Sequence, residues 1–371
     1  MPSYNDLRPD SDESRKDYAL VFPEMTGVEK KRTIENLLVL RAGLDATVAT
    51  KKSDRNVLIA SWNIKEFGHT TQRLPEAFFY TAEILDRFDL VVVQEVKTGL
   101  EDLYRLMKLL GDDWSYLVND ITEGNSGNSE RGAYLYNNKR IHFAGLAGEI
   151  VLWDALTQNA SIQQLKRTPY LTGFRTGWKS FSLVNLHLHP GDASDDIAYR
   201  REEVELLLAA LETKTAAGTL WNKNIIAAGD FNFYEGASKD DPTLDLVRAA
   251  GFREVEGLRG VDTNASQTEV YDRLFLTSND YFKVALDANG RENGGVFPIF
   301  DYVYKDGEEE IYKAYMLEQY TGNKDLEAPG KLTSYFKHPW RKNQMSDHFP
   351  IWFELITDSA DSFLETKLAA Y

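Results

Sequence analysis

The sequence predicts an α/β fold with mixed sheets, and three observations support this. Five short apolar runs have the length and composition of buried strands. Segments with helical periodicity separate the early runs, and later runs follow one another as strand pairs. Each run also ends in a polar side chain, where a sheet edge opens to solvent. The runs cover residues 56–64, 89–96, 181–189, 224–232 and 346–355.

Length and composition set the first limits. The chain has 371 residues, 43% of them hydrophobic, which suffices for one large domain or two small ones. No apolar run approaches the ~18 residues of a membrane-spanning helix. The polar N-terminal residues lack the apolar stretch of a Sec-type signal peptide, which favours the cytoplasm. Secretion after removal of a signal, or by another route, is the alternative.

Charge and cysteine content narrow the chemistry. With no cysteine the chain has no disulfide and no thiolate metal site, so oxygen and nitrogen ligands would hold any metal. Such ligands suit Mg²⁺, Mn²⁺ or Ca²⁺. The net charge of −16 argues against a broad basic face that grips nucleic acid. It is compatible with an enzyme that meets phosphate through metal ions and a few local cations, and equally with a device for solubility.

The order of segments predicts four parts. Residues 1–27 form a polar, loosely ordered arm, and residues 28–54 form an extension whose amphipathic helix covers 28–48. Residues 55–358 form the main domain, and residues 359–371 a tail with a short helix. Further helices are predicted at 75–88, 99–110, 197–215, 242–250 and 308–319. Polar loops are predicted at 119–132 and 289–295, and a long stretch at 324–345 ends in basic and aromatic residues.

Two strand ends carry side chains suited to phosphate chemistry. Asp230 and Asn232 follow one strand, and their Asp-x-Asn spacing puts two short side chains on one side of the backbone. Such a pair can orient a water molecule and hold a phosphate oxygen. Glu95 at the end of another buried strand is a natural ligand for a hard metal, and Asn63 ends a third. The alternative for each is a turn or a solvated strand end.

Histidines supply candidate proton-transfer groups. Asp347 and His348 directly precede a strand, so Asp347 could ligate a metal while His348 takes or gives a proton near neutral pH. His187 and His189 share one face by strand alternation. One of the two could be catalytic, and the other is then a surface or core histidine.

Asp272 opens a further strand and could orient His348, as buried carboxylates orient imidazoles elsewhere. The alternative is an ion pair with its neighbour Arg273. Each of these signals is modest alone, but their joint appearance at successive strand ends indicates one site.

Six motifs, in this order along the chain, resemble those of the endonuclease/exonuclease/phosphatase superfamily. They are Trp-Asn at 62–63, Gln-Glu at 94–95, Leu-His at 186–187, Gly-Asp-Phe-Asn at 229–232, Tyr-Asp-Arg at 271–273 and Ser-Asp-His at 346–348. The match extends over residues 56–356, nearly the whole chain. The resemblance implies a four-layer sandwich of two mixed sheets flanked by helices, with residues 55–358 as the catalytic domain.

Within the superfamily the chain looks most similar to deoxyribonuclease-I-like endonucleases. The similarity lies in Trp-Asn-Ile-Lys-Glu-Phe-Gly at 62–68, Gln-Glu-Val-Lys at 94–97, the Asn/Ser-rich loop at 124–131, Arg167 before Thr-Pro, and His187 with a proline three residues later. Lys65 and Lys97 depart from that family's arginines and lose the bidentate fork. Tyr134 is the nearest aromatic residue to the family's groove-probing tyrosine. Residues 261–268 resemble a structural Ca²⁺ loop, shifted by one residue.

The resemblance implies a role for each candidate residue. The metal, Mg²⁺ or Mn²⁺, is expected at Glu95, Asn63 and Asp347. Proton transfer and positioning of water and phosphate are expected of His187, His348, Asp230, Asn232 and Asp272. Contacts to substrate phosphates are expected from Arg167, Lys65, Lys97 and Tyr134.

The expected activity is metal-dependent, largely sequence-nonspecific cleavage of DNA by a monomer. One alternative is a phosphatase or phosphodiesterase of the same fold acting on RNA, nucleotides or lipid head groups, which the acidic charge favours. A catalytically inactive binding module is the other, but no expected metal or proton-transfer position is substituted. Metal-dependent cleavage of plasmid DNA would distinguish the nuclease from both alternatives.

Overall fold

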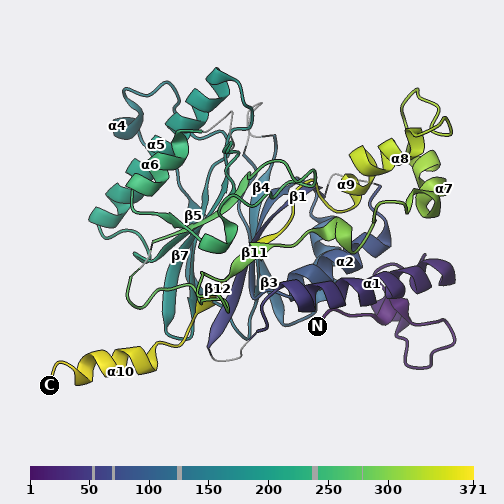
Figure 1. Cartoon of the computed structure of the whole chain (residues 1–371), viewed down its shortest axis with the longest axis horizontal. Coiled ribbons are helices and arrows are strands. Elements are labelled where there is room, and N and C mark those ends of the chain that lie inside the picture. The colour runs from purple at the N-terminus through teal and green to yellow at the C-terminus, as the bar shows by residue number, and fades with distance from the viewer. Residues whose placement is uncertain (52–54, 69–71, 123–127, 236–240, 278) are drawn as a thin grey trace.

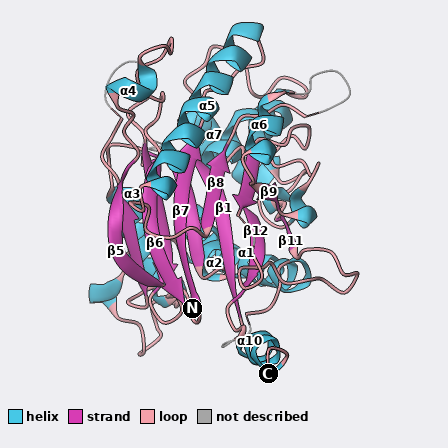
Figure 2. Cartoon of the chain, turned by 90° about the vertical axis from the view of Figure 1, so that its left-hand side faces the viewer, coloured by secondary structure: helices cyan, strands magenta, loops and turns pink. Residues whose placement is uncertain are grey.

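Two six-stranded sheets packed face to face form the centre of the molecule, with helices on both outer faces (Figures 1 and 2). The structure, a computed structural model, describes residues 1–371 except 52–54, 69–71, 123–127, 236–240 and 278. Both sheets mix parallel and antiparallel pairs. The four-layer α/β sandwich is therefore confirmed.

The first sheet has the order β11-β12-β1-β2-β4-β3. Its central strand β1 (Asn56–Phe67) pairs antiparallel with β12 (Ile351–Ile356) and parallel with β2 (Leu90–Val96). β1 is buried over its first nine residues, as its continuous apolar run predicts. The remaining strands are β3 (Trp114–Val118), β4 (Arg131–Asn137) and β11 (Gly294–Val296).

The second sheet has the order β5-β6-β7-β8-β10-β9. Its strands are β5 (His142–Glu149), β6 (Tyr170–Thr176), β7 (Lys179–His187), β8 (Ile225–Asp230), β9 (Arg253–Glu254) and β10 (Asp272–Leu276). β7 and β8 run parallel, and β10 runs antiparallel to β8. The inner faces of the two sheets share one apolar core, which includes Ile59, Val92, Leu183, Ile226, Leu274 and Phe353.

Helices cover the two outer faces. Apolar residues of α1 (Gly27–Thr47), α2 (Pro75–Asp86) and α3 (Glu101–Leu110) join the core outside the first sheet. On the second sheet lie α4 (Asp154–Thr157), α5 (Ser194–Ala216) and α6 (Thr243–Ala249). α7 (Glu309–Gln319), α8 (Lys331–Tyr335) and α9 (Arg341–Gln344) project beside the first sheet, and α10 (Ala360–Leu368) projects at the C-terminus (Figure 1). Among the described residues, no helix combines the length and apolarity needed to cross a bilayer.

All five strand runs predicted from the sequence are strands, although the last begins only at Ile351. Most of the second half of the long stretch at 324–345 is helical. It forms α8, a π-helical turn at Phe336–Trp340, and α9. Only part of the loop predicted at 119–132 can be compared, since residues 123–127 lie outside the described residues. Its last two residues begin β4.

The N-terminal arm is packed rather than loosely ordered. Leu7, Phe22 and Met25 are buried, and Phe22 lies against the rings of Phe78 and Phe79. These few apolar residues anchor a segment whose average composition is polar, which explains why composition alone misjudged it. The division of the chain into four parts stays a prediction.

Candidate active site

The strand ends meet at one edge of the two sheets. Register places His187 of β7 opposite Asp230 of β8, and Asp230 opposite Asp272 of β10. In the first sheet, Asn63 of β1 lies opposite Gln94, directly before Glu95. Residues far apart in the sequence are therefore brought together by strand pairing, which fixes their backbones rigidly.

The backbone is strained at this edge. Glu95 has φ 61° and Asn232 has φ 52°, in the left-handed region that side chains rarely adopt. Gly229, near the end of β8, has φ 146°, and a Cβ there would lie 1.9 Å from the carbonyl oxygen of Leu186. Strained residues of this kind cluster at functional sites.

His348 is held between carboxylates. Its Nδ1 lies 2.7 Å from Asp272 Oδ2, and its Nε2 lies 3.7 Å from Asp230 Oδ2. Burial opposes the charge on His348, but Asp272, Asp230 and Asp347 outweigh it and raise the pKa of the imidazole well above its usual value. The alternative partner for Asp272 does not apply, because Arg273 pairs with Glu254 and Glu235 instead.

A second histidine–carboxylate pair faces the first. His187 Nδ1 lies 2.9 Å from Glu130 Oε2, and His187 Nε2 lies 3.6 Å from the same Asp230 oxygen that His348 approaches. Glu130 was not predicted from the sequence, because a glutamate after a polar loop resembles an ordinary solvated carboxylate. Only its burial, at 4% exposed, and its three cationic or imidazole neighbours distinguish it.

Asn63 is hydrogen-bonded to both Glu95 and Asp230. Its Nδ2 donates to Glu95 Oε1 at 3.0 Å and to Asp230 Oδ2 at 3.1 Å. Its Oδ1 is buried and has no hydrogen-bond partner among the described residues. A buried, unpaired amide oxygen beside a carboxylate is what a hard divalent cation would satisfy. The donors present therefore fit Mg²⁺ or Mn²⁺.

Two groups of side chains have ligand atoms within 4.8 Å of one another, close enough to share a metal ion: Glu95, Glu130 and His187, and Asp230, Asp272 and His348. Asp347 belongs to neither group. Its Oδ2 lies 3.3 Å from Lys65 Nζ. The structure thus brings Asn63 and Glu95 together, whereas Asp347 flanks them.

The loop at 261–268 uses its polar atoms to support the site. Asn264 Oδ1 accepts from the backbone of Thr268 and Glu269, and the backbone of Ala265 donates to Asp347. Thr263 Oγ1 accepts from the backbone N–H of Asp272 at 3.0 Å. A structural Ca²⁺ in this loop stays a prediction.

The candidate phosphate contacts divide into three cases. Arg167 lines a small pocket with Glu95 and His187, and its Nε donates to Glu130 at 2.7 Å. Lys65 stands at the site edge beside Asp347, whereas Lys97 is buried with its Nζ 3.3 Å from Glu130 Oε1. Lys97 therefore neutralises Glu130 and presents little surface to a substrate.

Tyr134 is a wrong assignment. It is fully buried between the sheets, its ring packs on Tyr170 and Phe174, and its hydroxyl donates to backbone carbonyls. Strand alternation explains the error, because in β4 position 134 points into the inter-sheet core. Tyr134 cannot reach a substrate.

A buried carboxylate on α5 holds two site segments. Glu203 accepts from the backbone N–H of Lys166 at 2.8 Å and of His189 at 2.9 Å. Those residues adjoin Arg167 and the segment that follows His187. His189 itself contacts Asp196, so it is a structural histidine while His187 faces the site.

Replacing Glu203 by alanine is expected to lower the free energy of unfolding by about 2–5 kcal/mol, because two buried N–H groups lose their acceptor. Glu212→Ala, at an exposed position of the same helix, is the matched control and should change stability by less than about 0.5 kcal/mol. Urea denaturation of both variants measures the difference. Equal unfolding midpoints would contradict this role.

Glu130 should make stability depend on pH. Burial opposes its charge, but His187, Arg167 and Lys97 outweigh burial and lower its pKa. A lowered pKa stabilises the fold above the unfolded value of about 4.3, and this contribution is lost as the pH falls below it. Wild type should exceed Glu130→Gln by about 2 kcal/mol in unfolding free energy at pH 6. The gap should narrow progressively as the pH falls below about 5, and a constant gap in urea titrations would refute the assignment.

Comparison with known proteins agrees with this geometry. No protein-family model matches the chain. Human deoxyribonuclease-1 is 28% identical over 169 residues, 43% of this chain and 56% of that protein. The dog protein of the same name is 27% identical over 183 residues, 47% of this chain and 59% of that protein. The chain is therefore similar in sequence, over part of its length, to deoxyribonuclease-1, as its endonuclease/exonuclease/phosphatase motifs predict. It spans about half the length of the curated relatives it matches.

The solved structures that resemble this one have low sequence identity to the chain. An endonuclease/exonuclease/phosphatase family protein from Bacteroides thetaiotaomicron has a TM-score of 0.49 at 16% identity, over 82% of this chain and 98% of that one. The human nocturnin catalytic domain has a TM-score of 0.47 at 14% identity, over 81% and 93% of the two chains.

Proposed function

We propose that the chain is a metal-dependent phosphodiesterase that cleaves DNA internally without sequence specificity. The observation that carries this proposal is the pair of histidines that both approach Asp230. Their Nε2 atoms lie 3.6 and 3.7 Å from one carboxylate oxygen, and each Nδ1 is held by its own carboxylate. Two oriented imidazoles around one small space suit attack on a phosphate and departure of an alkoxide from its opposite sides.

Each side chain has a part in this reaction. Bound Mg²⁺ or Mn²⁺, held by Glu95 and Asn63, would supply charge neutralisation to the phosphate oxygens and the leaving oxygen. Asp230 and Asn232 position the attacking water and the phosphate. His187 and His348 form the acid–base pair, with Glu130 and Asp272 orienting their rings. Arg167 and Lys65 bind substrate phosphates, and Asp347 lies at the edge of the metal position.

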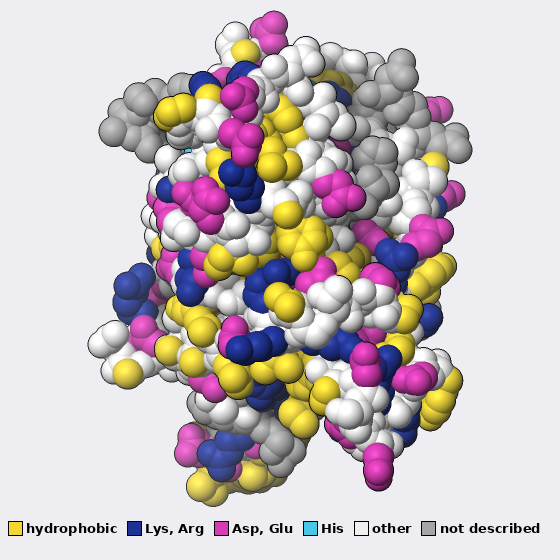
Figure 3. Space-filling model, turned by 90° about the vertical axis from the view of Figure 1, so that its right-hand side faces the viewer, with side chains coloured by type: hydrophobic (Ala, Val, Ile, Leu, Met, Phe, Trp, Pro, Cys, Tyr) yellow, Lys and Arg dark blue, Asp and Glu magenta, His cyan; other side chains and the backbone are white. Residues whose placement is uncertain are grey.

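DNA is the proposed substrate because the curated relatives are named deoxyribonuclease-1 and share the motifs around the site. The face carrying α1 and α7 to α9 mixes basic and acidic side chains and has no broad basic area (Figure 3). With a net charge of −16, binding to DNA should therefore be weak and sensitive to salt. Residues 55–358 are the proposed catalytic domain, in a protein that acts as a monomer.

A panel of substrates tests the choice of DNA over other phosphoesters. Plasmid DNA, a structured RNA and p-nitrophenyl phosphate are each incubated with the protein in Mg²⁺. The proposal expects turnover of the plasmid to exceed that of the other two by at least about tenfold. Faster hydrolysis of p-nitrophenyl phosphate would replace the nuclease by a phosphatase of the same fold, and faster RNA cleavage by a ribonuclease.

A further inference from the structure

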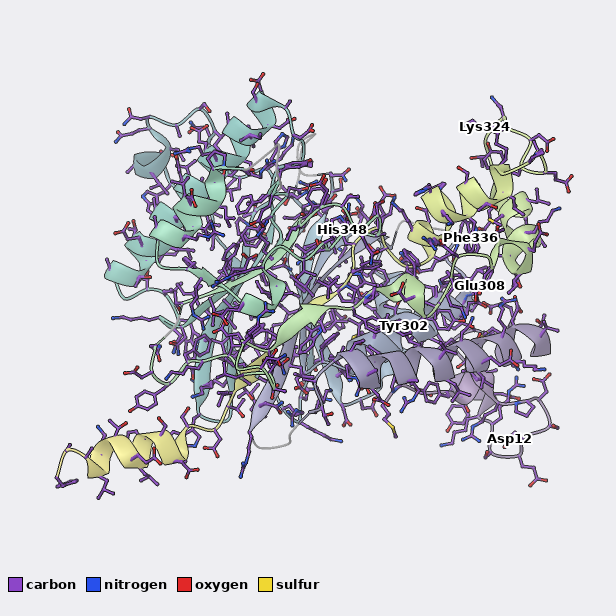
Figure 4. All side chains as sticks on the ribbon, viewed as in Figure 1. Asp12, Tyr302, Glu308, Lys324, Phe336 and His348 are labelled. Atoms are coloured by element: carbon purple, nitrogen blue, oxygen red, sulfur yellow. The ribbon has the colours of Figure 1, made fainter. Side chains whose placement is uncertain are left out.

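The basic segment at 331–342 belongs to a lobe that stands beside the catalytic edge. We call residues 301–345, with α7 to α9, the side lobe. Figure 4 shows it next to His348, with Phe336 on its near part and Lys324 at its far tip. Its base packs on α1: Tyr315 donates to Glu29 Oε1 at 2.7 Å, and a Cβ on Gly43 would lie 2.1 Å from the Tyr302 ring.

Buried aromatic rings fix the shape of the side lobe. Phe336 and Trp340 are fully buried and pack on the ring of Tyr312. Trp340 Nε1 also donates to Gln319 Oε1 at 2.7 Å. With both ends of the π-helical turn anchored in this way, the cations that follow it are held in place rather than free to rearrange.

Hydrogen bonds tie α9 to the end of β1. Gln344 is fully buried, and its carbonyl accepts from Arg73 Nε at 2.9 Å. The same guanidinium donates through Nη2 to the carbonyl of Lys65 at 3.2 Å. The side lobe and the strand that carries Asn63 and Lys65 are thus connected through Arg73.

Two lysines from these two elements converge on Asp347. Lys65 Nζ lies 3.3 Å from Asp347 Oδ2. Lys342 Nζ lies 3.4 Å from Ser266 Oγ, in the loop whose Ala265 N–H donates to the Asp347 carbonyl. Burial first, and then the charges of Lys65 and Arg341, lower the pKa of Lys342 against the opposing effect of Asp347.

Asp347 is the carboxylate that acts on Lys342, but from beyond ion-pair distance. Among the described residues Lys342 makes no ion pair, whereas Lys337 and Arg341 both pair with Asp306. An amine that is half-buried, positioned by a rigid lobe and left with only a hydroxyl as partner is prepared for an anion. Lys342 and Lys65 thus place two amines near Asp347, in a chain of net charge −16.

We propose that Lys342 and Lys65 together bind the DNA phosphate that neighbours the scissile one, so that the side lobe extends the substrate-binding surface of the catalytic edge. The proposal rests on the proposed function, because it locates a second phosphate of that substrate. It gives Lys342, at the end of a basic segment that no superfamily motif accounts for, a role in holding the strand in register with the histidines.

The test measures binding without cleavage. A fluorescein-labelled 14-base-pair DNA is titrated, in Mg²⁺, into His348→Ala and into the same variant carrying Lys342→Gln. We expect Lys342→Gln to weaken binding by about tenfold at low salt. It should also reduce the slope of log affinity against log salt by about one. Lys331→Gln, at the exposed start of α8, is the matched control and should bind as the parent does.

Each outcome is decisive. Tenfold weaker binding with a smaller salt slope supports the second phosphate position. If the parent binds DNA and Lys342→Gln binds it equally, the side-lobe site is wrong and the proposed nuclease function stands. If the parent itself does not bind DNA, the proposed function fails and the side-lobe site with it.

Discussion

Replacing His348 by alanine should lower kcat/KM for DNA by about 10³-fold, within the range of about 10²–10⁴ that a placed histidine contributes. The imidazole lies between Asp272 and Asp230, with its Nε2 3.7 Å from Asp230 Oδ2. The folded state should survive, since the ring is at the site edge rather than in the apolar core. Plasmid nicking rates in Mg²⁺ provide the comparison, with circular dichroism to check the fold.

The exposed His142 gives a matched control for that substitution. His142→Ala removes the same atoms from the edge strand β5, away from the strand ends that form the site. It should retain activity within about twofold, because surface changes of this kind rarely disturb a fold. Near-normal activity of His348→Ala would remove His348 from the acid–base pair.

Glu95→Gln should reduce kcat/KM for DNA by about 10²–10³-fold and weaken metal binding. The change keeps the size of the side chain but removes the negative charge that a divalent cation requires, and metal stabilisation of a phosphate is worth several kcal/mol. Titration of activity with Mg²⁺ should show a higher half-saturating concentration, and calorimetry with Mn²⁺ a weaker affinity. Both readouts are needed, since a fold defect would lower activity without changing the metal dependence.

Glu310→Gln, exposed on α7, controls for the loss of one negative charge from the whole molecule. It should behave as wild type in both titrations. An unchanged Mg²⁺ requirement in Glu95→Gln would place the metal elsewhere. Asp230, in the second group of potential ligands, would then be the next residue to test.

Strands with continuous apolar runs were predictable, and those with mixed faces were not. β1, β2 and β8 are largely buried, so apolar residues dominate most of their lengths. β5 is largely exposed and rich in glycine and alanine, and β9 has only two residues. Neither gives a periodic signal, because pairing with a neighbour rather than burial defines them.

Which site residues could be predicted from the sequence also depended on their place in the strands. Asp230 and Asp272 were predicted because they end or open strands, and His348 because it precedes one. Strand ends meet at sheet edges. Glu130 was missed because its importance arises from three partners that are distant in sequence. Tyr134 was misplaced because the resemblance gave a nearby aromatic residue and not the direction in which its side chain points. The register of the strand pairs shows which residues lie opposite one another in each sheet, and local sequence does not contain this information.

The proposed DNA cleavage can be measured on supercoiled plasmid incubated with the wild-type protein, in Mg²⁺ and in EDTA. We expect conversion first to nicked circles and then to fragments without a preferred sequence, abolished by EDTA. Nicked circles must precede the fragments because the single site cuts one strand at a time. Plasmid that stays supercoiled in Mg²⁺ and in Mn²⁺ would contradict the account.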